Sequence, residues 1–282
     1  MANLIDGQER LDWRNPASYR PLLDLDRSGW AWEFLRRNPD YRKAVQSLPK
    51  PTQERWLMPP LSLISAVGIS PEWGCPFAAP PDNDALAAPP FWLASVDPSV
   101  LPVAVISPHH TEDAFDVMDL GQVVTVFRDR GGTEHVQIGR PPRPIRLHVE
   151  TGTVLRGPVA LHASLAGCAV QSRLRTLRRL LDLQRRGRQC ADHDGPDARG
   201  ARLAFILQVL DGHDAGASQR EIGIALFGKD RVREDWNGYS DYLRSRICRA
   251  IKAGQALRDR GYRNLLRGLP SRPAAANDND VP

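Results

Sequence analysis

The chain has 282 residues, of which 41% are hydrophobic and 25% charged, and its net charge at pH 7 is +5. A chain of this length can form one large domain or two to three small ones without covalent cross-links. Its four cysteines include no C-x-x-C pair, which argues against a disulfide framework and a four-cysteine zinc site. No stretch of about 18 apolar residues and no secretion signal is visible, so we expect a cytoplasmic protein that does not enter a membrane.

Residues 8–48 are rich in aromatic and aliphatic side chains and predict a small helical module. Two Asn-Pro pairs, at Asn15 and Asn38, are breakers, and the segment between them predicts a short helix that ends before the second proline. The aromatic side chains either form the core of this module or expose a surface that docks another protein. Both arrangements are compatible if a tryptophan is partly exposed. The candidate protein-interaction residues are Trp13, Trp30, Trp32 and Tyr41.

The middle of the chain changes character twice. Residues 49–90 are rich in proline, which predicts a semi-rigid connection, with only a short helical piece at 61–68. Residues 91–165 then show the alternation of β-strands, and the pattern around 145–149 predicts a small antiparallel sheet with one buried and one solvent-exposed face. The expected strands are 91–96, 103–106, 122–127, 134–138, 145–149 and 154–161.

Signals for catalysis are weak. His109 and His110 precede Glu112 and Asp113, but adjacent histidines on a turn point apart and no second cluster completes a tetrahedral site, so we expect no metal. The sequence lacks a G-x-G-x-x-G after a strand, a P-loop, a G-x-S-x-G and an H-x-x-x-H on a helix. We therefore expect a protein that is not an enzyme and has no cofactor.

Residues 171–268 predict helices, followed by a short polar tail at 269–282 that we expect to be disordered. A first helix, starting near Gln171, carries leucines on one face and arginines on the others, and a second is expected to pack beneath the helix pair that follows it. The first helix carries Leu174, Leu177 and Leu181 on one face with Leu180 at its edge, and the second carries Leu203, Ile206, Leu207 and Leu210.

The helix pair begins at Ser218, a typical N-cap residue, and its first helix ends at Gly228, which suits a left-handed C-terminal position. Residues 229–238 then form a connection of about ten residues, where three or four are usual in a helix-turn-helix. Ser240 is the expected cap of the second helix. This helix carries one apolar stripe formed by Leu243, Ile247, Ala250 and Ile251.

The opposite side of the second helix is basic. At about 100° per residue it presents Ser245, Arg249 and Lys252, with Arg244 and Arg246 at its flanks. Because arginine reads guanine edges and flanking cations hold phosphates, we predict that Arg249 and Lys252 contact bases and the flanking arginines contact phosphates. An arginine-rich face can also be simple solvated surface. The candidate DNA-binding residues are Ser218, Gln219, Arg220, Arg244, Ser245, Arg246, Arg249 and Lys252.

The charge distribution favours the DNA-binding alternative. Residues 171–272 contain 22 Lys and Arg against 12 Asp and Glu, a net charge of +10. Residues 1–170 contain 16 against 19, a net charge of −3. Positive charge is therefore concentrated in the segment that contains the helix pair, as an electrostatic contact with DNA requires.

The C-terminal motifs resemble those of the FseA-type activators, which control excision and transfer of integrative and conjugative elements in proteobacteria. The resemblance covers residues 174–268, and the N-terminal motifs resemble the small module that precedes this domain in the activators. The motifs are Ser218-Gln-Arg-Glu-Ile-(x2)-Ala-Leu-Phe-Gly228, Asp235-Trp236, Leu243-Arg-Ser-Arg246, Gly261-Tyr-Arg-(x)-Leu-Leu-Arg267, Asp12-Trp-Arg-Asn-Pro-(x2)-Tyr19 and Trp30-Ala-Trp-Glu-Phe-Leu-Arg-Arg-Asn-Pro-(x)-Tyr41.

Together with the patterns above, the resemblance predicts an α+β protein, mainly α-helical, with a C-terminal helix-turn-helix variant, a small antiparallel β-region in the middle and a small helical N-terminal module. It implies a sequence-specific activator that binds double-stranded DNA upstream of an excision or transfer promoter and recruits RNA polymerase. The resemblance also implies that an antiactivator protein could mask the activator. Whether the chain forms a homo-oligomer is not decided by the sequence. The alternative is an antiactivator-like regulator that binds protein and not DNA. We also expect the N-terminal module to fold and act apart from the DNA-binding domain.

Overall fold

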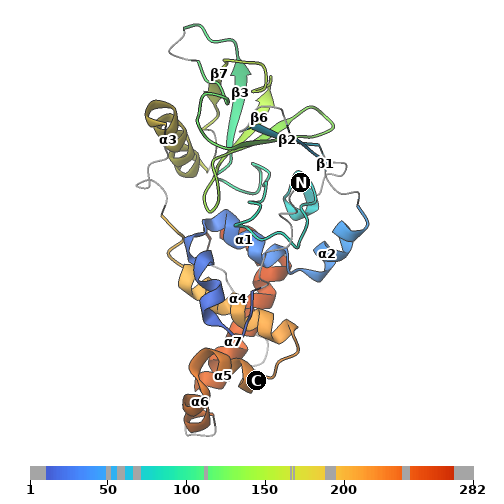
Figure 1. The fold of residues 1–282 in the computed structure, drawn as a ribbon, viewed down its shortest axis with the longest axis vertical. Helices are drawn as coiled ribbons and strands as arrows, with labels where there is room; N and C mark the ends of the chain where they lie inside the picture. The colour runs from blue at the N-terminus through green and yellow to red at the C-terminus, as the bar shows by residue number, and fades with distance from the viewer. Residues whose placement is uncertain are drawn as a thin grey trace, which may run out of the picture.

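The computed structural model describes residues 11–48, 52–55, 61–65, 71–110, 114–165, 167, 169–187, 195–236 and 242–269. The fold is α+β, as the sequence predicts. A sheet lies at one end of an elongated molecule, helices form its middle, and α5 (Gln219–Phe227) and α6 (Lys229–Asp235) lie at the other end (Figure 1). Within the described part of the chain, no helix has the length and apolar character needed to cross a membrane.

Three short helices near the N-terminus begin where a polar side chain caps them. Asn15, Asp26 and Asn38 each accept a hydrogen bond from a backbone N–H of the first turn. Proline follows both asparagines, and its fixed φ suits the first helical position. The expected short helix between the two Asn-Pro pairs is confirmed. The elements are η1 (Pro16–Asp24), α1 (Arg27–Leu35) and α2 (Pro39–Gln46).

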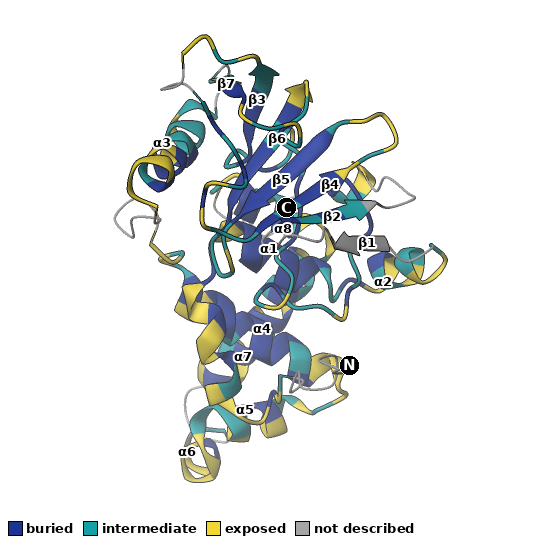
Figure 2. Cartoon of the chain, turned by 45° about the horizontal axis from the view of Figure 1, so that its top comes forward, coloured by how far each residue is buried: buried dark blue, intermediate teal, exposed yellow. Residues whose placement is uncertain are grey.

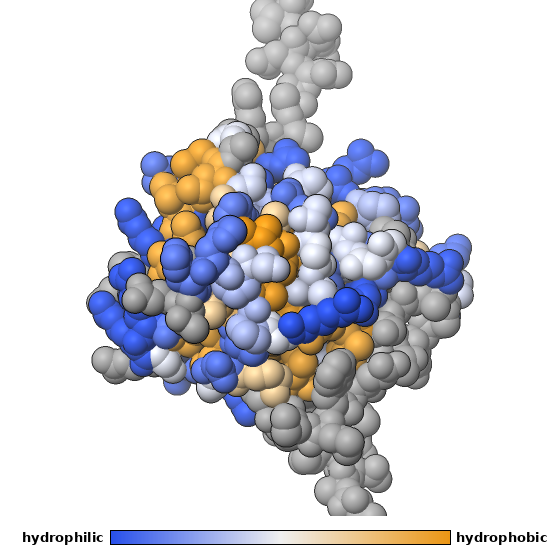
Figure 3. All heavy atoms as spheres, turned by 90° about the horizontal axis from the view of Figure 1, so that it is seen from above, coloured by the Kyte–Doolittle hydropathy of each residue, from blue (hydrophilic) through white to orange (hydrophobic). Residues whose placement is uncertain are grey.

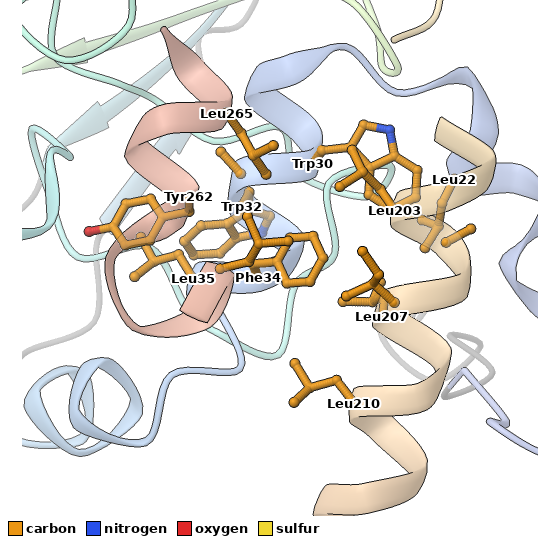
Figure 4. Close-up of a cluster of buried hydrophobic side chains, with 14 of the residues drawn as sticks. Leu22, Trp30, Trp32, Phe34, Leu35, Leu203, Leu207, Leu210, Tyr262 and Leu265 are labelled. Carbon is orange, nitrogen blue, oxygen red and sulfur yellow. The ribbon is translucent and has the colours of Figure 1, made fainter. Parts of the chain in front are cut away.

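The aromatic residues of this segment form a core with the C-terminal helices. Trp30, Trp32 and Tyr41 have no exposed surface, and Trp13 is 8% exposed. They belong to one hydrophobic cluster with residues of α4 (Gly200–Asp214), α7 (Tyr242–Ala256) and α8 (Tyr262–Leu266). Figure 4 shows side chains of α1 lying between those of α4 and α8. The structure therefore assigns the four aromatic residues to the core, and they are not available as an exposed docking surface.

Polar contacts tie the same two segments together. The Tyr19 hydroxyl donates to Asp211 Oδ2 at 2.6 Å, and Arg37 donates to both carboxylate oxygens of Asp211. Gln208 Nε2 donates to the carbonyl oxygen of Trp13 at 2.8 Å. We call η1, α1, α2 and the helices from α4 to α8 the helical body. Its shared core contradicts the expectation that the N-terminal module folds apart from the C-terminal helices.

The strands form one sheet with the order β1-β2-β4-β5-β6-β3-β7 among the described residues. The β2–β4 and β3–β6 pairs are parallel, and the other pairs are antiparallel. The sheet is therefore mixed, and not antiparallel throughout as expected. Its strands are β1 (Thr52–Arg55), β2 (Leu61–Ser65), β3 (Leu101–Ile106), β4 (Val124–Arg128), β5 (Glu134–Ile138), β6 (Ile145–Thr151) and β7 (Ala160–Ala163).

Several expected elements differ from those observed. The proline-rich connection contributes β1 and β2, so the helix expected at 61–68 is wrong, and residues 66–68 lie outside the described part. Residues 91–96 form no strand, and within 154–161 only the last two residues belong to β7. Proline lacks a backbone N–H donor and therefore disfavours strands. Residues 61–65 contain no proline, so this short segment can still pair with a neighbouring strand. A 3-10 turn, η2 (Pro71–Trp73), follows.

The central strands are covered on both faces, and every residue of β5 is buried (Figure 2). On the face expected to meet solvent, Gln137 and Arg146 donate hydrogen bonds to the carbonyl oxygen of Pro90. Burial, together with neighbouring His148, lowers the pKa of His135 on this face to about 4. The expectation of one solvent-exposed face is wrong. An irregular segment packs over this face, and the polar side chains of the strands donate hydrogen bonds to its backbone carbonyl groups.

Helix α3 (Val170–Arg186) packs on the other face of the sheet, away from the C-terminal helices. Leu180 and Leu183 are buried against the strands, whereas Leu181 is 39% exposed. Leu177 also packs against this core, so the expected stripe is confirmed at Leu177 and at its edge residue Leu180, and it is wrong at Leu181. Seen from the sheet end, hydrophobic and hydrophilic residues lie side by side on the surface (Figure 3).

Candidate nucleic-acid interface

Helix α5 (Gln219–Phe227) begins at a capping box, as its sequence predicts. The backbone N–H of Glu221 donates to the Ser218 hydroxyl at 3.2 Å, and the backbone N–H of Ser218 donates to Glu221 Oε2 at 2.8 Å. The Ser218 hydroxyl also donates to this carboxylate, so both its donated and its accepted hydrogen bond belong to the helix cap. Arg220 on the first turn is exposed, and Gln219 is half-buried.

A sharp turn at Gly228 joins α5 to a second short helix, α6 (Lys229–Asp235). Gly228 has φ 87° and ψ 155°, a backbone conformation that is essentially restricted to glycine. Helix α5 ends at this glycine as expected. The positive φ is as expected too, but ψ lies outside the range of the left-handed helical conformation. Residues 229–238 are not a plain connection as expected, because α6 occupies most of them. Residues 237–238, and the expected cap Ser240, lie outside the described part.

Helix α7 separates an apolar face from a polar one, as predicted. Leu243, Ile247, Ala250 and Ile251 are buried, and Gly254 joins them where α7 packs closely on α4. The apolar residues predicted for α4 are buried as well and form the surface beneath α7. After α7 the chain continues through a π-helical turn (Leu257–Gly261) into α8.

The polar face of α7 carries most of the candidate DNA-binding side chains. Arg244, Ser245, Arg249 and Lys252 are all exposed. Arg249 Nε donates to the carbonyl oxygen of Ser245 one turn earlier, at 3.2 Å. Among the described residues, neither Arg244 nor Lys252 forms a hydrogen bond or an ion pair. These cations are therefore available to an external anion.

Arg246 differs from its neighbours because aromatic rings hold it. Its guanidinium carbon lies 4.7 Å from the ring centroid of Phe205 and 5.3 Å from that of Phe227. Such cation–π contacts stabilise the side chain by about 0.5–1 kcal/mol at a partly exposed site. The contact joins α7 to α4 and α5, so Arg246 has a structural role that the sequence pattern did not indicate.

Helix α6 adds basic residues that sequence reasoning missed because it treated the segment as a connection. Lys229, Arg231 and Arg233 are exposed, and Arg233 lies 3.9 Å from Asp230. Helices α5 and α6 both pack on α7 at the end of the molecule opposite the sheet (Figure 1). In the sequence, a glycine directly followed by a charged, helix-compatible run was the signal for α6.

Two family models match the chain. Residues 159–267 match the family described as "T6SS, Transcription factor, DNA binding domain", and residues 12–77 match the family described as "Proteobacterial transcriptional regulator-like domain". No curated protein matches the chain significantly. The first match contains β7, α3 and the helices from α4 to α8, with the basic face of α7. The second contains η1, α1 and α2, which share a core with the C-terminal helices, and strands β1 and β2. Together with that exposed basic face, the matches support a DNA-binding transcriptional regulator.

Proposed function

We propose that this regulator is a sequence-specific transcriptional activator that places the polar face of α7 in the major groove of double-stranded DNA. The observation that carries the proposal is the set of exposed cations on α7, directly opposite the stripe that fixes the helix on α4. A helix held by its apolar face presents the other face with little loss of conformational freedom on binding.

Within this proposal the basic residues divide by position. Arg249 and Lys252 lie at the centre of the exposed face and would contact bases, whereas Arg244 lies at its flank and would contact phosphate. Arg246 would offer only the edge of its guanidinium, because its face lies against two rings. Since Ser218 caps α5, the contacts of that helix would come from Gln219 and Arg220.

A first test measures the salt dependence of binding by the full chain to random duplex DNA. Neutralising about six phosphates should give a slope near −5 in a plot of log affinity against log salt concentration. A slope close to zero, or no binding at low salt, would favour the alternative of an antiactivator-like protein that binds another protein.

A second test separates base contacts from phosphate contacts after the bound genomic fragments have been sequenced. Arg249→Ala should weaken binding to the selected site by about 1–3 kcal/mol and binding to random DNA far less. The matched control is Arg178→Ala on α3, which removes the same charge from an exposed position on the sheet side of the molecule. Equal losses on both kinds of DNA would reduce Arg249 to a phosphate contact.

The resemblance to FseA-type activators supports a narrower proposal. The regulated genes would be those for excision or transfer of a mobile element, RNA polymerase would be the partner in activation, and an antiactivator could mask the protein, with homo-oligomerisation as a further possibility. We propose regulation and not catalysis, without a cofactor. Because the aromatic residues of α1 and α2 are buried, the contact with RNA polymerase would need another surface.

A further inference from the structure

A cavity of about 630 Å³ lies where the sheet side of the molecule meets the helical body. Its walls come from the first turn of α1, one face of α3, the segment 195–199 before α4, and the end of α8. Asp97, Ser99 and Arg146 complete it on the side of the sheet. In Figure 1 the elements α1 and α3 lie well away from α5 and α6, so this cavity is separate from the candidate DNA interface.

Basic side chains outnumber acidic ones in this cavity. Three aspartates line it, and two of them already face an arginine: Asp26 accepts from Arg146 at 2.8 Å, and Asp197 from Arg199 at 2.7 Å. Burial raises the pKa of the third, Asp97, although the nearby charge of Arg146 and hydrogen bonds from Ser28 and Ser99 act to lower it. The arginines that line the cavity are Arg27, Arg146, Arg175, Arg179 and Arg199.

Arg146 is the residue that indicates a ligand. It is 4% exposed, and while its Nη1 donates to Asp26, its Nη2 is buried and has no hydrogen-bond partner among the described residues. A buried donor left unsatisfied costs about 1–3 kcal/mol and more when it is charged, so such groups are uncommon in proteins. An acceptor from a bound molecule would remove that cost.

The neighbouring polar groups are already engaged. Asp97 accepts hydrogen bonds from the Ser28 hydroxyl and from the backbone N–H and hydroxyl of Ser99. The Thr176 hydroxyl donates to the carbonyl oxygen of Ser99 at 2.7 Å. These contacts fix the wall that faces α3. The cavity is therefore preformed, and it lies within the range of about 300–1,000 Å³ that is typical of small-molecule sites.

We propose that this cavity binds a small molecule through a carboxylate or phosphate group, which Arg146 holds in the interior and Arg175 holds at the rim. Arginine binds both groups through two parallel N–H donors. A DNA duplex is too wide to reach Arg146, because this residue is nearly fully buried. The ligand would contact α3 on the sheet side and the segment before α4 in the helical body, so it would bridge the two cores of the protein.

The test is isothermal titration calorimetry on the full chain without DNA, at constant ionic strength, with sodium phosphate in one series and sodium succinate in the other. The proposal expects saturable binding with one site per chain in at least one series, and the series that saturates identifies the anionic group. Absence of saturable heat in both series would overturn it. Because no DNA is present, the result is independent of the proposed function.

Three variants locate the binding site. Arg146→Lys keeps the charge beside Asp26 but loses the second donor group, and should weaken binding by about tenfold. Arg175→Ala changes an exposed residue at the rim and should weaken binding by about fivefold. Arg178→Ala, on the same helix but outside the cavity, should leave binding unchanged.

Two outcomes of the variant series would contradict the proposal. If Arg178→Ala weakens binding as much as Arg175→Ala, the anion is attracted by the general charge of α3 and not held in the cavity. If Arg175→Ala leaves binding unchanged, the rim contact is absent. Thermal unfolding of each variant shows whether Arg146→Lys still folds, and Arg175→Ala keeps the proposal testable if it does not.

Discussion

Helices α3 and α7 are both amphipathic and arginine-rich, yet they occupy different surroundings. Helix α3 packs its apolar face on the sheet, and its Arg179 is 6% exposed and donates to the carbonyl oxygen of Arg143. Helix α7 packs on α4 beside α5 and α6, and its central cations are exposed. Helix α3 also has exposed arginines, such as Arg178 and Arg185. Arginine content therefore does not distinguish the two helices, and the comparison between them rests on what surrounds each one.

The first way to test this comparison is to remove the segment whose buried apolar side chains belong to the core of α7 and not to the core of α3. Deleting residues 1–50 removes the buried tryptophans of α1 from the core beneath α4 and α7. The stabilisation lost with these buried side chains is larger than the small net free energy of unfolding of a typical domain. We therefore expect α4 and α7 to lose protection in hydrogen exchange and the protein to lose DNA binding. Strands β4 to β6 and α3 should stay protected. A truncated protein that keeps both α7 protection and DNA affinity would show that the N-terminal segment folds apart.

The second prediction concerns an ion pair in the helical body. Glu33 is fully buried and accepts from Arg36 and Arg37 at 2.8 Å, and from the backbone N–H of Ala85. Glu33→Gln leaves these partly buried arginines without their charged partner and should lower the free energy of unfolding by about 3–5 kcal/mol. Glu150→Gln, at an exposed position, is the control and should change stability little.

The pH dependence of that variant has a defined sign. Burial alone would raise the pKa of Glu33, but the two arginines and the N–H of Ala85 outweigh it and hold the pKa below its usual value of 4.5. The stabilisation is therefore complete above the unfolded-state pKa and is lost as the pH falls through the folded-state pKa. In urea denaturation, the difference between wild type and Glu33→Gln should stay constant down to about pH 4.5 and shrink below it. A difference that grows on acidification would contradict this assignment.

What the sequence predicted correctly rests on local signals. The cap at Ser218, the glycine stop at Gly228 and the apolar stripe of α7 each depend on residues within a few positions of one another. Strands β5 and β6 were also visible from alternation and the turn between them. The face that α7 buries follows from its periodicity, so the exposure of most candidate residues could be predicted.

What the sequence did not show depends on contacts between distant residues. The hydrogen bond between Tyr19 and Asp211 joins residues 192 positions apart in sequence. Strand β2 pairs in parallel with β4, although β3 lies between them in the sequence. For α3, two candidate stripes overlap, and only the position of the sheet decides that Leu183 is buried and Leu181 is not. The polar face of β6 is covered because Arg146 finds partners in segments far away in sequence.

The third prediction concerns the turn that orients α5 and α6 against α7. Gly228→Val should lower the free energy of unfolding by about 1–3 kcal/mol, because a φ of 87° with extended ψ is available almost only to glycine. A β-carbon there would meet no atom within 4 Å, so the cost is one of backbone conformation and not of space. Gly195→Val has equal room without a positive φ and is the matched control. Equal losses of melting temperature in the two variants would contradict this explanation.

The smallest expected effect bears most directly on the comparison of α3 and α7. Arg244 on α7 and Arg185 on α3 are both exposed arginines, so replacing either by alanine removes the same charge. If α7 faces the DNA, Arg244→Ala should reduce the magnitude of the salt slope by about 1, the effect of one lost phosphate contact. Arg185→Ala should leave the slope unchanged. Binding to random duplex DNA, measured by fluorescence anisotropy over a range of salt concentrations, gives both slopes. A reduction in both variants would make α3 a second contact surface, and a reduction in Arg185→Ala alone would move the interface from α7 to α3.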